Sequence, residues 1–143
     1  MAVFYETHGG AGGGTSAPAV IVCQAARVEY HVLFAGISVG DFDAGIEWYE
    51  RFFGRPPDVV AHDEEVMWHV TSDGWLYVMR DPARAGSATV AIAVPSLAEA
   101  LRRLEASGVS AGEVEHVGDT ARKAVVRDPE GNSISLVEVS EGA

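Results

Sequence analysis

Apolar and polar positions follow two regular patterns from about residue 30 onward, and together these patterns predict alternating strands and helices. Runs typical of strands cover residues 33–39, 58–62, 65–71 and 75–80. Between the first two runs, Ile46, Tyr49 and Phe53 recur at spacings of three and four, which predicts an amphipathic helix capped by Asp41 or Asp43. The first half of the chain therefore has the order strand, helix and three strands.

The same order repeats in the second half. A strand is predicted over 89–94, and a capping box over 96–99 opens a helix that Gly108 ends. Further strands are predicted over 112–117, 122–127 and 133–139. We interpret the two halves, about 30–81 and about 88–139, as an internal duplication of one βαβββ unit. Each unit is too small to be stable alone, so the prediction is an α+β fold whose two sheets form a cupped surface with helices outside.

The most strongly specified turn in the chain is Asp128-Pro129-Glu130-Gly131-Asn132, which joins the last two strands. Asp128 can accept backbone N–H bonds, Pro129 fixes φ, and Gly131 supplies a positive φ. In the strand that follows, Ile134 and Leu136 alternate with serines, so one face of the sheet is apolar and the other is small and hydroxylated. A polar second face is typical of a sheet that borders water or a ligand.

The amino-acid composition limits the classes of partner that this protein can bind. The 143 residues include 10 basic and 21 acidic side chains, and the net charge of -11 disfavours binding to nucleic acid or to an anionic membrane. A single cysteine, Cys23, fits a reducing compartment, and we predict a cytoplasmic protein. Residues 1–27 are Gly-rich and are predicted to be a flexible leader, whose apolar run over 17–22 is too short to span a membrane.

Three groups of residues carry a resemblance to a known family. They are Ile37-x-Val39-x-Asp41 leading into Ile46-x-x-Tyr49-x-x-Phe52-Phe53-Gly54, Leu97-x-x-Ala100-x-x-x-Leu104-x-x-x-Gly108-Val109, and Arg127-Asp128-Pro129-Glu130-Gly131-Asn132. With these residues the chain resembles the vicinal oxygen chelate superfamily, which includes glyoxalases, bleomycin-resistance proteins and extradiol dioxygenases. The resemblance covers about 30–139. It implies paired βαβββ units, a U-shaped sheet around a cavity and, frequently, a homodimer.

The resemblance also implies where a metal would bind. Members of the superfamily that use a metal carry one His, Glu or Gln ligand on each of four strands, and the corresponding positions here are Phe34, Tyr77, Thr89 and Ser135. None of these side chains is a good ligand for a divalent cation. We therefore expect a site without metal and without another cofactor, unless the ligands are unorthodox.

Strand alternation predicts the wall of the cavity. The predicted ligand-binding residues are Phe34, Ser38, Met67, His69, Trp75, Tyr77, Met79, Thr89, Arg122 and Ser135. The aromatic residues could stack on a planar ligand while hydroxyls orient it. Arg122 could pair with an anionic ligand, although an exposed arginine is the alternative. The aromatic residues could also simply fill a small core.

The candidate functions differ in class. The favoured hypothesis is a protein that binds and sequesters a planar or apolar, antibiotic-like metabolite, as metal-free bleomycin-resistance proteins do. The alternative is a lyase, isomerase or dioxygenase that uses unorthodox metal ligands, or His69 and Tyr77 in acid–base catalysis. His69 is the best candidate of the five histidines, but no carboxylate stands at a recognisable spacing from it. A third hypothesis is a collapsed cavity in a dimerisation or scaffolding module.

Overall fold

The computed structural model describes residues 27–140 of the chain. The predicted leader over 1–27 lies outside these residues except for its last position, so that prediction stays open. Of the described residues, 32–140 belong to one compact unit. Within 27–140, no helix is both long enough and apolar enough to cross a membrane.

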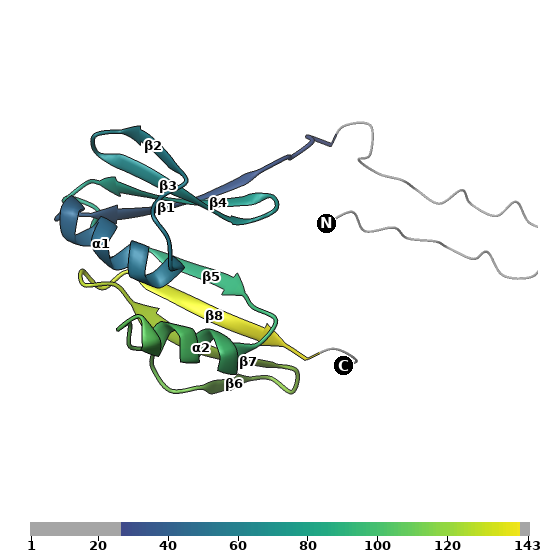
Figure 1. Ribbon diagram of the computed structural model, residues 1–143. Helices are drawn as coiled ribbons and strands as arrows, with labels where there is room; N and C mark the ends of the chain where they lie inside the picture. Colours follow the sequence, from purple (N-terminus) through teal and green to yellow (C-terminus); the bar gives the residue numbers. More distant parts are fainter. Residues whose placement is uncertain (1–26, 141–143) are drawn as a thin grey trace, which may run out of the picture. The chain divides into compact units, whose positions relative to one another are not determined.

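The first half of this compact unit contains one helix and one four-stranded sheet (Figure 1). Along the chain the elements are β1 (Leu33–Val39), α1 (Phe42–Phe53), β2 (Val59–His62), β3 (Glu65–Thr71) and β4 (Gly74–Arg80). In the sheet the order is β1-β4-β3-β2, with β1 parallel to β4 and the other pairs antiparallel. Asp41 caps α1 by accepting the Ala44 N–H at 3.1 Å, as predicted.

The second half repeats this arrangement. Its elements are β5 (Thr89–Ala93), α2 (Leu97–Ala106), β6 (Glu115–Val117), β7 (Ala121–Arg127) and β8 (Ser133–Val139). The sheet order is β5-β8-β7-β6, again with one parallel pair, β5 and β8. These observations confirm the α+β fold and the tandem βαβββ units. No ladder of strand hydrogen bonds within 27–140 joins the two sheets, so they are separate four-stranded sheets.

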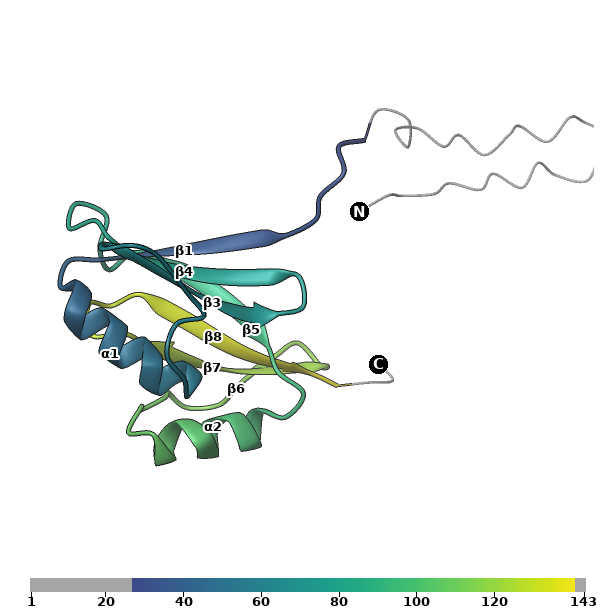
Figure 2. The same ribbon diagram turned by 45° about the horizontal axis from the view of Figure 1, so that its top comes forward.

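Each sheet has a helix face, which packs against the helices, and an open face on its other side (Figures 1 and 2). In β1, Ile37 and Val39 are buried on the helix face, while Phe34 on the open face is exposed. In β8, Ile134 and Leu136 are buried in the same way. The buried side chains of both halves belong to one apolar core, which also includes residues of α1 and α2. The duplicated units therefore share a single core.

The predicted turn after β7 is the most densely hydrogen-bonded part of this core. The Asp128 carboxylate, only 5% exposed, accepts the backbone N–H groups of Glu130 and Asn132, both at 2.9 Å. Its other oxygen accepts the Asn132 side-chain amide at 2.7 Å and the Tyr49 hydroxyl at 2.9 Å. Gly131 has the predicted positive φ, 100°. Burial, and then the charge of Asp128, raises the pKa of the Tyr49 phenol, which keeps the hydroxyl proton available as a donor.

Two further side chains of this turn connect the halves. The Glu130 carboxylate accepts the Gly40 N–H with both oxygens at 2.7 Å, at the entrance to α1. The fully buried Asn132 donates to the Ser38 carbonyl oxygen at 3.0 Å and accepts the Ala88 N–H at 2.9 Å. The turn thus fixes the end of β1 and the start of β5 together. The negative charge of Glu130 also lies where the dipole of α1 favours an anion.

The capping box predicted for α2 is only half formed. Ser96 Oγ accepts the Glu99 N–H at 3.2 Å, as expected. The Glu99 carboxylate does not return to the start of the helix, because it accepts hydrogen bonds from Arg102 and Arg103 on the exposed side of α2. The helix start is therefore completed by a side chain from elsewhere in the chain.

That side chain is Glu138 of β8. Its carboxylate accepts the Leu97 N–H at 3.0 Å and a hydrogen bond from Arg122 at 2.7 Å. The hydrogen bond from Arg122, and then the one from Leu97, holds the pKa of Glu138 below its usual value. Glu138 thus ties α2 to the sheet that it covers.

The Asp128 network predicts a large loss of stability when its carboxylate is removed. Asp128→Ala leaves backbone N–H groups, the Asn132 amide and the Tyr49 hydroxyl without an acceptor in the core. We expect the free energy of unfolding to fall by about 3 kcal/mol, and by about 1 kcal/mol for Tyr49→Phe. Urea denaturation measures both changes. As a control, Asp119→Ala in the exposed turn before β7 should change stability by less than about 0.5 kcal/mol; equal effects of the two Asp substitutions would contradict this account.

The lowered pKa of Glu138 predicts a pH-dependent contribution to stability. Because the folded pKa lies below that of the unfolded chain, about 4.3 for glutamate, the contribution is complete above that pH and is lost as the pH falls through the folded value. Glu138→Gln should therefore lower the denaturation midpoint at pH 7, and the difference from the wild type should shrink in acid. Thermal unfolding between pH 7 and pH 3 tests this, with exposed Glu113→Gln as the control; a difference that does not vary with pH would refute it.

Candidate functional site

Three rings form a row on the open face of the first sheet, one from each of three adjacent strands. Phe34 of β1 stacks beside Trp75 of β4, with ring centroids 6.3 Å apart and 21° between the planes. His69 of β3 stacks on the other side of Trp75, at 4.6 Å and 23°. Phe34 is 52% exposed, His69 is exposed and Trp75 is half-buried. The row therefore places an aromatic surface, made of three rings stacked against one another, outside the core.

The next positions along the strands continue this surface. Tyr77 of β4 lies between Gly36 of β1 and Met67 of β3 in the register of the sheet. Gly36 makes room for the phenol, because a Cβ at that position would collide with the Tyr77 ring. One step further, Met79 pairs with Ser38. All of the predicted site residues of the first half thus lie together on the open face.

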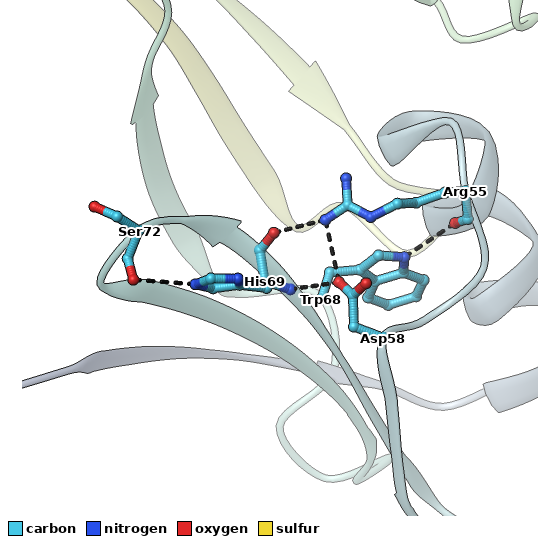
Figure 3. Close-up of polar contacts among 5 residues, drawn as sticks. All are labelled: Arg55, Asp58, Trp68, His69 and Ser72. Atoms are coloured by element: carbon cyan, nitrogen blue, oxygen red, sulfur yellow. Dashed lines mark hydrogen bonds and ion pairs between the residues drawn. The ribbon is translucent and has the colours of Figure 1, made fainter.

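Two residues that precede β2 hold the main chain of His69 (Figure 3). The Asp58 carboxylate accepts the His69 N–H at 2.7 Å, and Arg55 donates to the His69 carbonyl oxygen at 2.6 Å. Arg55 also donates to Asp58 at 3.1 Å, and its own carbonyl oxygen accepts the Trp68 indole N–H at 3.0 Å. The His69 N–H, and then Arg55, lowers the pKa of Asp58, so this carboxylate is charged at neutral pH.

This network differs from a catalytic carboxylate–histidine pair. Asp58 binds the backbone of His69, whereas the ring nitrogen Nε2 lies 3.1 Å from the Ser72 carbonyl oxygen. Among residues 27–140, no hydrogen bond joins His69 to Tyr77, the other candidate for acid–base chemistry. The geometry fixes an imidazole on the open face but supplies no carboxylate to orient it as a base.

The predicted site residues of the second half divide between the two faces. Thr89 of β5 and Ser135 of β8 lie on the open face, opposite Ser133 and Ala91 respectively. Arg122 of β7 does not join them, because it shares the helix face with Ala124 and binds Glu138 there. Within 27–140, no hydrogen bond or ring contact links the open-face candidates of the second sheet to those of the first.

Two positively charged side chains on the open face of β7 were not identified from the sequence. Lys123 and Arg127 alternate with the buried Ala124 and Val126, and Arg127 donates to Ser133 Oγ at 2.8 Å. The sequence does indicate which face they occupy, because the small apolar residues at 124 and 126 belong to the buried face. Counting from them places the odd-numbered cations, and not Arg122, on the open face.

The residues at the four positions where the resemblance implies metal ligands do not fit a metal. Phe34, Tyr77, Thr89 and Ser135 lie on the open faces, where they offer no donor, a phenol and two neutral hydroxyls. Divalent cations of such sites require imidazole or carboxylate ligands. In the described part of the chain, no three His, Cys, Asp or Glu side chains gather closely enough to hold a metal ion.

A groove of about 740 Å³ lies on the other side of the sheets, between the C-terminal end of α1 and α2. Its apolar lining includes Phe52, Phe53, Ile92 and Leu136. None of the predicted cavity residues lines it. The groove and the aromatic row are therefore distinct surfaces on opposite faces.

This chain is similar to a known domain family and to several solved structures. A family model described as a glyoxalase-like domain matches residues 34–137. A glyoxalase / bleomycin resistance protein from Catenulispora acidiphila DSM 44928 is 34% identical, with a TM-score of 0.73 over 77% of this chain and 99% of its own. The antibiotic binding protein TnmS3 from Streptomyces sp. CB03234 is 21% identical, with a TM-score of 0.65 over 80% and 99% of the two chains.

A bleomycin-binding protein complexed with bleomycin is 19% identical, with a TM-score of 0.61 over 78% of this chain and 98% of its own. A search of curated proteins finds no match to the sequence. The two structures below 25% identity show a shared fold alone. The match of the family model over most of the compact unit, together with the 34% identical structure, establishes that this chain belongs to the glyoxalase-like domain family of the vicinal oxygen chelate superfamily.

Proposed function

We propose that this protein binds and sequesters a planar or apolar, antibiotic-like metabolite against the open face of its first sheet, without a metal. The observation that carries the proposal is the row Phe34, Trp75 and His69, whose rings lie on the sheet surface and not in the core. None of the three rings belongs to the apolar core of the described residues. Aromatic patches outside a core are typical of ligand or partner surfaces.

Sequestration requires only that the protein binds the ligand, with no chemical reaction. A flat ligand on the row would bury apolar surface at about 25 cal/mol per Å², and each aromatic pair would add about 0.5–1.5 kcal/mol. Hydroxyls on the same open face, such as those of Ser38 and Tyr77, would orient the ligand. The names of two proteins that share the fold, an antibiotic binding protein and a bleomycin-binding protein, agree with this ligand class.

Two expectations accompany the proposal. The family resemblance implies a homodimer, and the composition favours the cytoplasm, and both stay predictions. The second candidate function is catalysis by a lyase, isomerase or dioxygenase. It is favoured by the exposed imidazole of His69 on the same face as Tyr77, and by the fold shared with a lactoylglutathione lyase from Agrobacterium tumefaciens, 17% identical.

Planar aromatic compounds should quench the fluorescence of the protein through Trp75. Trp48 and Trp68 are 8% and 0% exposed, so Trp75 is the tryptophan that a ligand on the open face can reach. In a titration with two- and three-ring aromatics, we expect saturable quenching. Calorimetry should then show affinity about tenfold or more weaker for Trp75→Leu, because stacking and buried apolar area are both lost.

Phe52→Leu is the matched control for this experiment, because Phe52 lines the helix-side groove and not the open face. Its affinity for the same compounds should equal that of the wild type. Loss of binding in Phe52→Leu with retention in Trp75→Leu would move the ligand to the groove. Absence of any saturable quenching would refute the proposed function.

Metal analysis separates binding from metal-assisted catalysis. Protein purified without chelators should contain far less than one equivalent of Zn, Ni, Fe or Mn per chain, because the four positions implied by the family carry no suitable donors. Elemental analysis by mass spectrometry measures this. One equivalent of any of these metals, retained after dialysis, would favour the enzyme over the sequestration protein.

A further inference from the structure

We propose that the ligand of the open face carries a hydrogen-bond donor, such as a phenolic hydroxyl or an aromatic N–H, which His69 accepts through Nδ1. This inference rests on the proposed function and adds a chemical class to the ligand. It follows from the environment of the His69 ring, which fixes both its tautomer and its orientation.

The tautomer follows from the Ser72 carbonyl oxygen, 3.1 Å from His69 Nε2 (Figure 3). A carbonyl oxygen only accepts hydrogen bonds, so Nε2 must carry the hydrogen of this contact. A neutral imidazole carries a hydrogen on one nitrogen alone. Nδ1 therefore has a free lone pair and acts as an acceptor.

The orientation follows from the stacking and from the main chain. The imidazole stacks on Trp75 at 4.6 Å, and a flip of the ring would remove its hydrogen bond to Ser72. Asp58 and Arg55 hold the backbone of the same residue at 2.7 and 2.6 Å. Within residues 27–140, no group hydrogen bonds to Nδ1. The exposed ring thus presents a fixed acceptor, without a partner in the described chain, at one end of the aromatic row.

This arrangement discriminates between ligands. A flat compound that covers the row displaces water from the surface and, if it lacks a donor, leaves Nδ1 without a hydrogen bond. A compound with a donor at its edge replaces the lost water. The net value of one such hydrogen bond corresponds to about three- to tenfold in affinity.

A matched pair of small probes tests the discrimination. 2-Naphthol and 2-methoxynaphthalene have the same two-ring system, but only the first can donate a hydrogen bond. By calorimetry, the wild-type protein should bind 2-naphthol about three- to tenfold more tightly. His69→Phe keeps a flat ring beside Trp75 and removes both nitrogens, so its affinities for the two probes should become equal. His116→Phe, an exposed histidine of β6, should retain the wild-type preference.

A spectroscopic measurement checks the tautomer independently of any ligand. Long-range ¹H–¹⁵N correlation spectra of histidine-labelled protein at pH 8 should show His69 with Nε2 protonated and Nδ1 unprotonated, assigned by the loss of these signals in His69→Phe. A protonated Nδ1 would overturn the inference.

The possible failures are distinguishable. Equal affinity of the wild-type protein for both probes would refute the role of His69 while leaving the proposed function intact. A preference for 2-naphthol that persists in His69→Phe would assign the donor to another acceptor and would also refute the inference. If neither probe binds, and no other planar aromatic quenches Trp75, the proposed function fails and the inference fails with it.

Discussion

The buried carboxylate of Asp128 is the constraint on which the two halves of this protein depend. It accepts hydrogen bonds from the backbone of its own turn, from the amide of Asn132 and from the hydroxyl of Tyr49, which belongs to the helix of the other half. A charged group in a core is stable only when its acceptor capacity is filled. The duplicated units are therefore bound together by directional bonds as well as by their shared apolar core, and this fixes the strands that carry the open face.

The two faces of each sheet therefore differ in role: the helix face forms the core, and the open face is left exposed. The helix faces contain the core, including Ile37, Val39 and Ile134, and the connections made by Glu130 and Glu138. The open faces contribute few buried side chains. Because alternate residues of one strand point to opposite faces, the open-face residues can change without disturbing the core. This separation explains how Phe34 and Thr89 can occupy two of the positions where the family resemblance implies metal ligands while the fold persists.

The sequence predicted the order and nearly all limits of the strands and helices, because apolar alternation, the turn after Arg127 and the helix caps agree with each other. It also placed the aromatic row on one face. It could not predict contacts between distant residues: the hydrogen bonds of Glu130 with Gly40 and of Glu138 with Leu97 span 90 and 41 positions. Arg122 was assigned to the wall of the cavity, although the apolar residues two and four positions later indicate the other face.

The same limit explains why the role of His69 needed the structure. Its alternation with buried residues showed the face on which it lies, and the absence of a carboxylate at a recognisable spacing argued against a catalytic pair. The group that determines the tautomer of His69 is the backbone carbonyl oxygen of Ser72. Every residue has a backbone carbonyl, so the residue type at this position does not predict the contact. Asp58, the carboxylate that does approach, binds the main chain and so positions the residue without activating its ring. An imidazole held in this way favours recognition of a donor over general-base catalysis, because no carboxylate among residues 27–140 hydrogen bonds to its ring.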